Sequence, residues 1–158
     1  GKISNMGKIN EIILEQALET YENNFQRRNN ISLDTNDFDI SFARGLSLED
    51  GAATLTAFTA KIITSKISLL LREYNNKKIK VLICGGGRKN KSLLKLIEAN
   101  SNKNLFFFNS DDFGLNGDFI ESQAFAYLAI RSILTLPISF PSTTGCNSPC
   151  SGGEIIEI

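Results

Sequence analysis

Two short apolar runs with a helical stretch between them constrain this chain more than any other feature of its sequence. Ile79 to Cys84 and Leu105 to Phe108 are rich in β-branched or aromatic residues and are bounded by glycine or polar turns, which is typical of strands. The residues from about Asn90 to Ala99 show helical spacing. This order predicts a βαβ unit, with a right-handed crossover and two parallel strands.

Two long helices are predicted before this unit. Apolar residues recur at helical spacing from Ile9 to Phe25 and again from Leu48 to Leu71, and a polar stretch, Asn29 to Asp39, lies between the two segments. Ser47 followed by Asp50 predicts a capping box at the start of the second helix. The second helix is expected to be mostly buried.

Another helix and a loop are predicted after the βαβ unit. The helix follows Gly117, reaches about Leu134, and is expected to turn a set of apolar residues inward: Ile120, Ala124, Tyr127, Leu128 and Ile130. Residues 137–153 are expected to be loop, and residues 154–158 either a terminal strand or an extended tail. The fold class is therefore α/β. Because a parallel sheet needs neighbours on its edges, two strands predict an incomplete parallel sheet with flanking helices.

Composition narrows the kind of protein and its partners. The chain has 158 residues, of which 42% are hydrophobic and 22% are charged, as in one ordinary globular domain. Lys plus Arg and Asp plus Glu are equal at 17 each, so no overall charge favours a nucleic-acid or anionic membrane partner. No apolar run is long enough to span a bilayer, and the polar first residues lack a signal-peptide core, so a cytoplasmic location is expected.

Three cysteines and the absence of histidine argue against a zinc site or a disulfide framework. Cys84 ends an apolar run and is predicted to be a small core residue. Cys146 and Cys150 are separated by three residues and are predicted to be reduced loop thiols. Pairing of these two under oxidation is the alternative.

The first candidate site is the turn from Cys84 to Asn90, which contains Gly85, Gly86 and Gly87. Consecutive glycines leave the backbone free to approach a ligand, and the N-terminus of the following helix offers N–H groups and a positive dipole to a phosphate. The spacing is neither that of the dinucleotide fingerprint nor that of the Walker A loop. A nucleotide site and an ordinary tight turn both fit this pattern.

Two other helix starts carry charged residues. Asp118 lies in the first turn of the helix after Gly117, where a carboxylate stabilises a helix by itself. Glu121 heads an apolar segment and either faces the junction, where a sugar hydroxyl could bind it, or stays solvated. Arg44 precedes the long second helix, and its surroundings indicate a capped helix of small residues that packs on the sheet.

Four blocks of sequence, taken together, resemble one family. They are Arg44 to Thr54, Cys84 to Asn90, Gly114 to Ala126 and Leu136 to Gly145. In order and spacing they resemble the C-terminal portion of the anhydro-N-acetylmuramic acid kinases, over about residues 31 to 153. The resemblance implies an actin-like, hexokinase-like ATPase fold of the ribonuclease H-like class, with nucleotide bound between two domains. Residues 1–158 would be the C-terminal portion of the second domain, with the N-terminal domain absent.

The resemblance also implies an activity. Those kinases use ATP and Mg²⁺ to open the 1,6-anhydro ring of anhydro-N-acetylmuramic acid with water and to phosphorylate its O6, in peptidoglycan recycling. The residues that carry over by position are Gly85, Gly86, Gly87, Asn90 and Asp118 for ATP, and Glu121 and Arg44 for the sugar.

One part of the family pattern has no counterpart in this sequence. The family's glycine-rich phosphate loop has no counterpart here. Its aspartate base, which follows a strand, is not matched either. None of the early aspartates lies at a strand end next to glycine: Asp34, Asp37, Asp39 and Asp50. Phosphoryl transfer needs phosphates, metal and attacking oxygen held in line, with help from a base. We therefore assign no catalytic residue and no protein metal ligand, and expect no kinase activity from this chain alone.

Two other functions fit parts of the sequence. A non-catalytic module that binds a nucleotide or a protein would keep the fold without the chemistry. A dinucleotide-binding oxidoreductase is suggested by the glycines, but the spacing fails and no acidic residue ends the run Leu105 to Phe108. As protein partners, we expect the missing N-terminal half, a second copy in a homodimer, or association through the open sheet edge.

Overall fold

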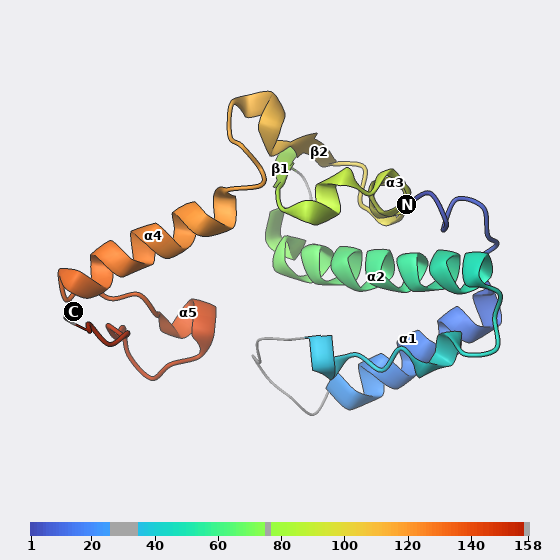
Figure 1. Cartoon of the computed structure of the whole chain (residues 1–158), viewed down its shortest axis with the longest axis horizontal. Helices are drawn as coiled ribbons and strands as arrows, with labels where there is room; N and C mark the ends of the chain where they lie inside the picture. Colours follow the sequence, from blue (N-terminus) through green and yellow to red (C-terminus); the bar gives the residue numbers. More distant parts are fainter. Residues whose placement is uncertain (26–34, 75–76, 157–158) are drawn as a thin grey trace.

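The computed structural model describes residues 1–25, 35–74 and 77–156. Figure 1 shows a long central helix with one helix on one side and a helix and two strands on the other. The main elements are α1 (Glu11–Phe25), α2 (Leu48–Leu70), β1 (Ile79–Ile83), α3 (Lys91–Asn100), β2 (Leu105–Asn109), α4 (Ile120–Ile133) and α5 (Pro141–Thr144). Short 3₁₀ helices connect them: η1 (Thr35–Asp37), η2 (Ser41–Ala43), η3 (Arg72–Tyr74), η4 (Gly86–Lys89) and η5 (Ser110–Phe113).

The main hydrophobic core lies between α1 and α2. Its buried members come from one face of each helix: Leu14, Ala17 and Tyr21 from α1, and Ala57, Phe58 and Ile62 from α2. The Tyr21 ring stacks on Phe38 at 5.9 Å and meets the edge of Phe58 at 6.1 Å between centroids. The residues that gave these segments helical spacing are therefore those that hold the two helices together, and both predicted helices are confirmed.

The start of α2 differs from the predicted capping box. The Ser47 hydroxyl accepts a hydrogen bond from the Asp50 amide at 3.1 Å, which is the first half of the motif. The Asp50 carboxylate instead accepts from the Lys8 amide at 2.7 Å. The segment before α1 lies against this helix end so closely that a Cβ on Gly7 would meet the Glu49 carbonyl. The competing Lys8 amide therefore replaces the reciprocal half of the box.

The predicted parallel strand pair with a helix between its strands is confirmed. β1 and β2 pair in parallel, with Ile79 opposite Leu105 and Ile83 opposite Asn109. α3 connects them and packs on α2. Each strand has one neighbour within the described residues, so the sheet is two-stranded there.

The prediction that α4 carries its apolar residues inward is wrong. The helix forms as expected, but none of its residues is buried within the described part of the chain. The exposed fractions are 59% for Tyr127 and 57% for Ile130, and Ala124 is also exposed. Ile120 and Leu128 are only half-buried. In Figure 1, α4 points away from the other helices, so its helical spacing is real but no described element covers it.

The segment after α4 holds more structure than the predicted loop. α5 forms one turn of helix, and Ser139 pairs with Cys150 in an isolated antiparallel bridge. Residues 154–156 form no strand, which favours the extended tail, and residues 157–158 lie outside the described residues.

Cys84 is exposed and not a core residue. Side chains alternate along β1, where Lys80 and Leu82 are exposed, and Cys84 continues this exposed face. Asp34 and most of the polar stretch that begins at Asn29 lie outside the described residues. No helix in the described residues is long and apolar enough to cross a membrane.

Candidate functional site

The glycine turn lies at the carboxyl end of β1 and is open to solvent. Gly85 has a φ of +75°, a backbone conformation that glycine adopts without strain. A Cβ on Gly85, Gly86 or Gly87 would meet no atom within 4 Å. The outer face of this turn therefore leaves room for a ligand to approach the backbone.

The turn does not lead straight into a long helix. Gly86–Lys89 forms η4, and α3 begins only at Lys91. The Asn90 side-chain oxygen accepts a hydrogen bond from the Leu93 amide at 3.1 Å and caps α3. Asn90 thus has a demonstrated structural role, and its predicted contact with ATP stays a prediction.

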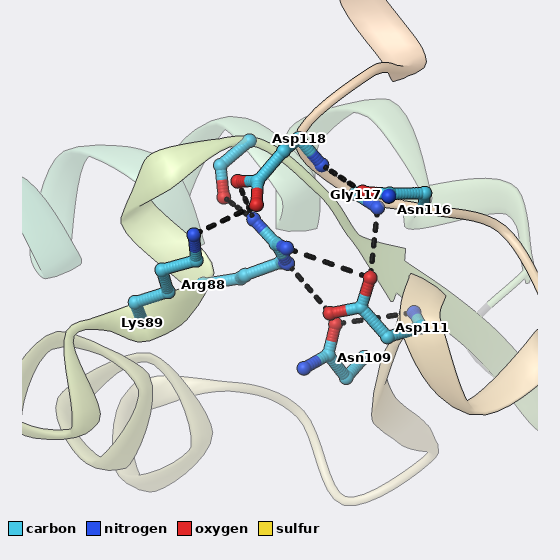
Figure 2. A network of polar contacts seen from close by, with 8 residues as sticks. Arg88, Lys89, Asn109, Asp111, Asn116, Gly117 and Asp118 are labelled. Atoms are coloured by element: carbon cyan, nitrogen blue, oxygen red, sulfur yellow. Dashed lines mark hydrogen bonds and ion pairs between the residues drawn. The ribbon is translucent and has the colours of Figure 1, made fainter.

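A buried arginine joins the glycine turn to the second junction. Figure 2 shows the Arg88 guanidinium between two carboxylates that follow β2. Arg88 Nε donates to Asp111 Oδ2 at 2.9 Å, and Nη1 donates to Asp118 Oδ1 at 2.6 Å and to the Gly85 carbonyl at 3.0 Å. Lys89 Nζ adds a contact of 2.8 Å to Asp118 Oδ2. We call Arg88, Lys89, Asp111 and Asp118 the Arg88 network.

The charges of this network stabilise one another. Hydrogen bonds from Arg88 and then Lys89 hold the pKa of Asp118 far below its usual range. The pKa of Asp111 is lowered by the hydrogen bond from Arg88 and by that from the Gly117 amide. The same carboxylates, Asp118 foremost, raise the pKa of Arg88. Both carboxylates are therefore ionised at neutral pH and paired with the basic side chains of Arg88 and Lys89.

The two junctions also meet through their backbones. The Gly85 amide donates to the Gly117 carbonyl at 2.9 Å, and the Gly117 amide donates to Asp111 Oδ1 at 2.8 Å. Gly117 is buried, and a Cβ there would lie 2.5 Å from Arg88 Nε and 2.7 Å from Ser110 Oγ. Close approach of the two chain segments therefore requires glycine at this position.

The remaining predicted site residues lie outside the Arg88 network. Glu121 is exposed in the first turn of α4, and Arg44 is exposed after η2, ahead of α2. Asp118 was predicted to lie in the first helical turn, but α4 begins two residues later and the carboxylate pairs with Arg88 and Lys89. The structure thus brings together the three glycines and Asp118, but not Glu121 or Arg44.

Sequence reasoning missed Arg88 and Asp111. The available signal was a basic residue directly after three glycines and an acidic pair, Asp111 and Asp112, just after the second apolar run. Parallel strands bring their carboxyl ends to the same sheet edge, so this pattern places the charges near that edge but does not show which of them pair. Asp111 also follows β2 by two residues, yet its carboxylate is paired with Arg88 and Gly117 and so is not a free partner for a ribose.

A largely apolar hollow of about 280 Å³ lies beside the glycine turn, between the sheet and helices α2 and α3. Gly87 and Arg88 form part of its wall, with Ile63, Val81 and Leu93. Pockets that enclose a drug-sized ligand have volumes of about 300–1,000 Å³. The volume of the hollow lies just below the lower end of this range.

A parallel strand pair with a crossover helix, and an open glycine turn held by an arginine and two carboxylates at its carboxyl end, define an α/β protein. The family model for anhydro-N-acetylmuramic acid kinase matches residues 2–157. The chain belongs to this family.

Curated relatives with this name agree along nearly the whole chain. The relative from Pelagibacter ubique is 48% identical over 157 residues, which cover 99% of this chain and 42% of that protein. The relative from Rhizobium rhizogenes is 39% identical over 158 residues, covering 99% and 40%. The relative from Caulobacter vibrioides is 35% identical over 158 residues, covering 100% and 40%. The chain thus spans about two fifths of the length of these relatives.

Proposed function

We propose that this chain supplies the second-domain side of the nucleotide cleft in an anhydro-N-acetylmuramic acid kinase with an actin-like ATPase fold. The observation that carries the proposal is the open turn Gly85 to Gly87 at the carboxyl end of β1. A Cβ on any of these glycines would meet no atom within 4 Å, and Arg88 holds the turn through the Gly85 carbonyl. A rigid backbone with no side chain in the way is what close contact with phosphate oxygens needs.

ATP and Mg²⁺ are the cofactors of this proposal. ATP supplies the phosphoryl group, and Gly85, Gly86, Gly87 and the following Asn90 would contact it. The carboxylates of Asp111 and Asp118 are already neutralised by Arg88 and Lys89. We therefore assign neither carboxylate to magnesium, which is usually bound by phosphate oxygens, water and one or two carboxylates. Asp118 would then act on the nucleotide site indirectly, through the side chains of Arg88 and Lys89 that it binds.

The sugar is proposed to be anhydro-N-acetylmuramic acid, as the family name states. Water would add across the bond between C1 and O6, and the freed O6 would accept the phosphoryl group, in peptidoglycan recycling in the cytoplasm. Glu121 and Arg44, both exposed, are the proposed sugar contacts. The 158 residues alone are expected to transfer no phosphate, because none of them matches the family's base.

A chimera tests this function. The matching segment of the Pelagibacter ubique relative is replaced by this chain, and phosphorylated product is measured by mass spectrometry after incubation with ATP, Mg²⁺ and the anhydro sugar. We expect product, and a loss of roughly tenfold or more in kcat/KM when Gly87→Val narrows the turn. A chimera that folds but phosphorylates no anhydro sugar would contradict the proposal.

A further inference from the structure

The Arg88 network contains two cations that differ in exposure. The side chain of Arg88 is 4% exposed, whereas that of Lys89 is 63% exposed. Arg88 donates hydrogen bonds to both carboxylates of the network and to the Gly85 carbonyl. Lys89 donates to one of these carboxylates, Asp118, from the surface. Arg88 is therefore the buried, fixed cation of the network, and Lys89 is the cation that a ligand can reach.

The ammonium group of Lys89 has hydrogen-bonding capacity that its protein partner does not use. A lysine ammonium carries three N–H donors. Within the described part of the chain, Lys89 Nζ has one hydrogen-bond acceptor, Asp118 Oδ2 at 2.8 Å. The other two donors are available to a bound group. An exposed ion pair of this kind adds little to stability, so holding the fold together is not the main effect of this contact.

Asp118 holds this ammonium group beside the glycine turn. Lys89 is the last residue of η4, which begins at Gly86. Arg88 Nη1 donates both to Asp118 Oδ1 at 2.6 Å and to the Gly85 carbonyl at 3.0 Å, so one nitrogen joins the carboxylate to the turn. Figure 2 shows Lys89 and Arg88 extending to the same carboxylate from neighbouring positions. The ammonium of Lys89 is thus tethered at the turn.

The charges of the network also require this second cation if an anion is to bind at the turn. The side chains of Asp111 and Asp118 are 41% and 47% exposed, so their negative charges lie close to the surface. Arg88 carries one positive charge and pairs with both carboxylates. Lys89 balances the second negative charge. Without Lys89, a phosphate at the turn would meet a net negative charge, which would repel it.

We propose that Lys89 contacts a phosphate group of the nucleotide, with Asp118 as the positioning residue that holds its ammonium group. The inference rests on the proposed function, because it requires that the turn from Gly85 to Gly87 binds the nucleotide. Lys89 is not among the residues that carry over from the family by position. The two remaining N–H donors of the tethered ammonium make charge-assisted hydrogen bonds to phosphate oxygens, and the tether lowers the cost of ordering the side chain.

The test is calorimetric titration of the whole chain and three lysine variants with Mg²⁺ and ATP. Lys89→Met should weaken ATP binding about tenfold, because it removes charge-assisted hydrogen bonds to the phosphate. Lys89→Arg keeps a cation at this position and should retain most of the affinity. Lys95→Met is the matched control, since it removes the same charge from an exposed position within α3. This control should bind ATP like the wild type.

Two further measurements separate a phosphate contact from a structural role. The urea midpoint of Lys89→Met should equal that of the wild type, because the lost ion pair is exposed. The affinity of the wild type for ATP should fall more steeply than that of Lys89→Met as NaCl is raised from about 0.05 M to about 0.3 M, because the variant has one ionic contact fewer.

The outcomes distinguish this inference from the proposed function. If Lys89→Met binds ATP as tightly as the wild type while Gly87→Val loses binding, the inference is overturned and the proposed function stands. An equal loss in Lys95→Met would show a general effect of charge and would also overturn the inference. If the wild type does not bind ATP, the proposed nucleotide site itself is wrong, and the role of Lys89 falls with it.

Discussion

The amide of Gly85 and the carbonyl of Gly117 are joined by a hydrogen bond of 2.9 Å, which ties the glycine turn after β1 to the junction before α4. Arg88 reinforces this link because it binds the Gly85 carbonyl and both Asp111 and Asp118. The two predicted candidate sites are therefore one structural unit.

Gly117→Ala should destabilise the chain by about 1–3 kcal/mol, because the new methyl group would overlap Arg88 and Ser110. Gly87→Ala is the matched control, since its Cβ would meet no atom within 4 Å. The control should change the free energy of unfolding by less than about 0.5 kcal/mol in urea titrations. Equal stability of the two variants would contradict the close packing at Gly117.

Acid should weaken the link between the two junctions. The pKa values of Asp111 and Asp118 are lowered in the folded chain, so their contribution to stability is present above the unfolded pKa, about 3.9, and is lost as the pH falls below it. The urea concentration at the midpoint of unfolding, measured from about pH 7 to pH 2.5, should decrease at the acid end of this range. Arg88→Met should be less stable at neutral pH and should lose less of its stability in acid. Parallel curves for both proteins would rule out this coupling.

The helices and strands were largely predictable from the sequence, because their signals come from residues close together in the chain. Strand residues such as Val81 and core residues such as Leu14 follow periodicities that the backbone imposes. The burial of Arg88 was not predictable, because it depends on two carboxylates brought from more than twenty residues away. The prediction that Tyr127 is turned inward was wrong for a related reason. Helical spacing shows which residues share a face of a helix, but it does not show whether another element covers that face.

Thr54→Val should cost about 1–3 kcal/mol of stability. The Thr54 hydroxyl is fully buried, donates to the Asp50 carbonyl at 2.7 Å and accepts from the Asn10 amide at 3.0 Å. Valine keeps the shape but leaves the Asn10 amide, at the start of α1, without its acceptor. Thr56→Val is the control, because that hydroxyl donates to the Ala52 carbonyl within the same helix at 2.6 Å. Similar losses from both variants, measured by urea unfolding, would show that Thr54 does not anchor α1.

The uncovered apolar residues of α4 should cause self-association of the isolated chain. Phe125 and Ile133 are each 64% exposed, and large exposed apolar surfaces mark interaction sites or aggregation liabilities. We expect light scattering to show a mass that rises with concentration, and the Phe125→Ser, Ile133→Ser double variant to reduce this rise. Leu70→Ser is the control, since Leu70 is 76% exposed at the end of α2. A chain that stays monomeric at every concentration would refute this prediction.

The central claim is that Gly85 to Gly87 form one side of a nucleotide site, and calorimetric titration of the chain with Mg²⁺ and ATP tests it most directly. The wild type should bind in the micromolar to millimolar range, and Gly87→Val should abolish binding while keeping its fold. Ser47→Ala should lose about 1 kcal/mol of stability with its helix cap and still bind like the wild type, which separates binding from stability. Binding that survives Gly87→Val unchanged, or no binding by the wild type, would contradict the claim.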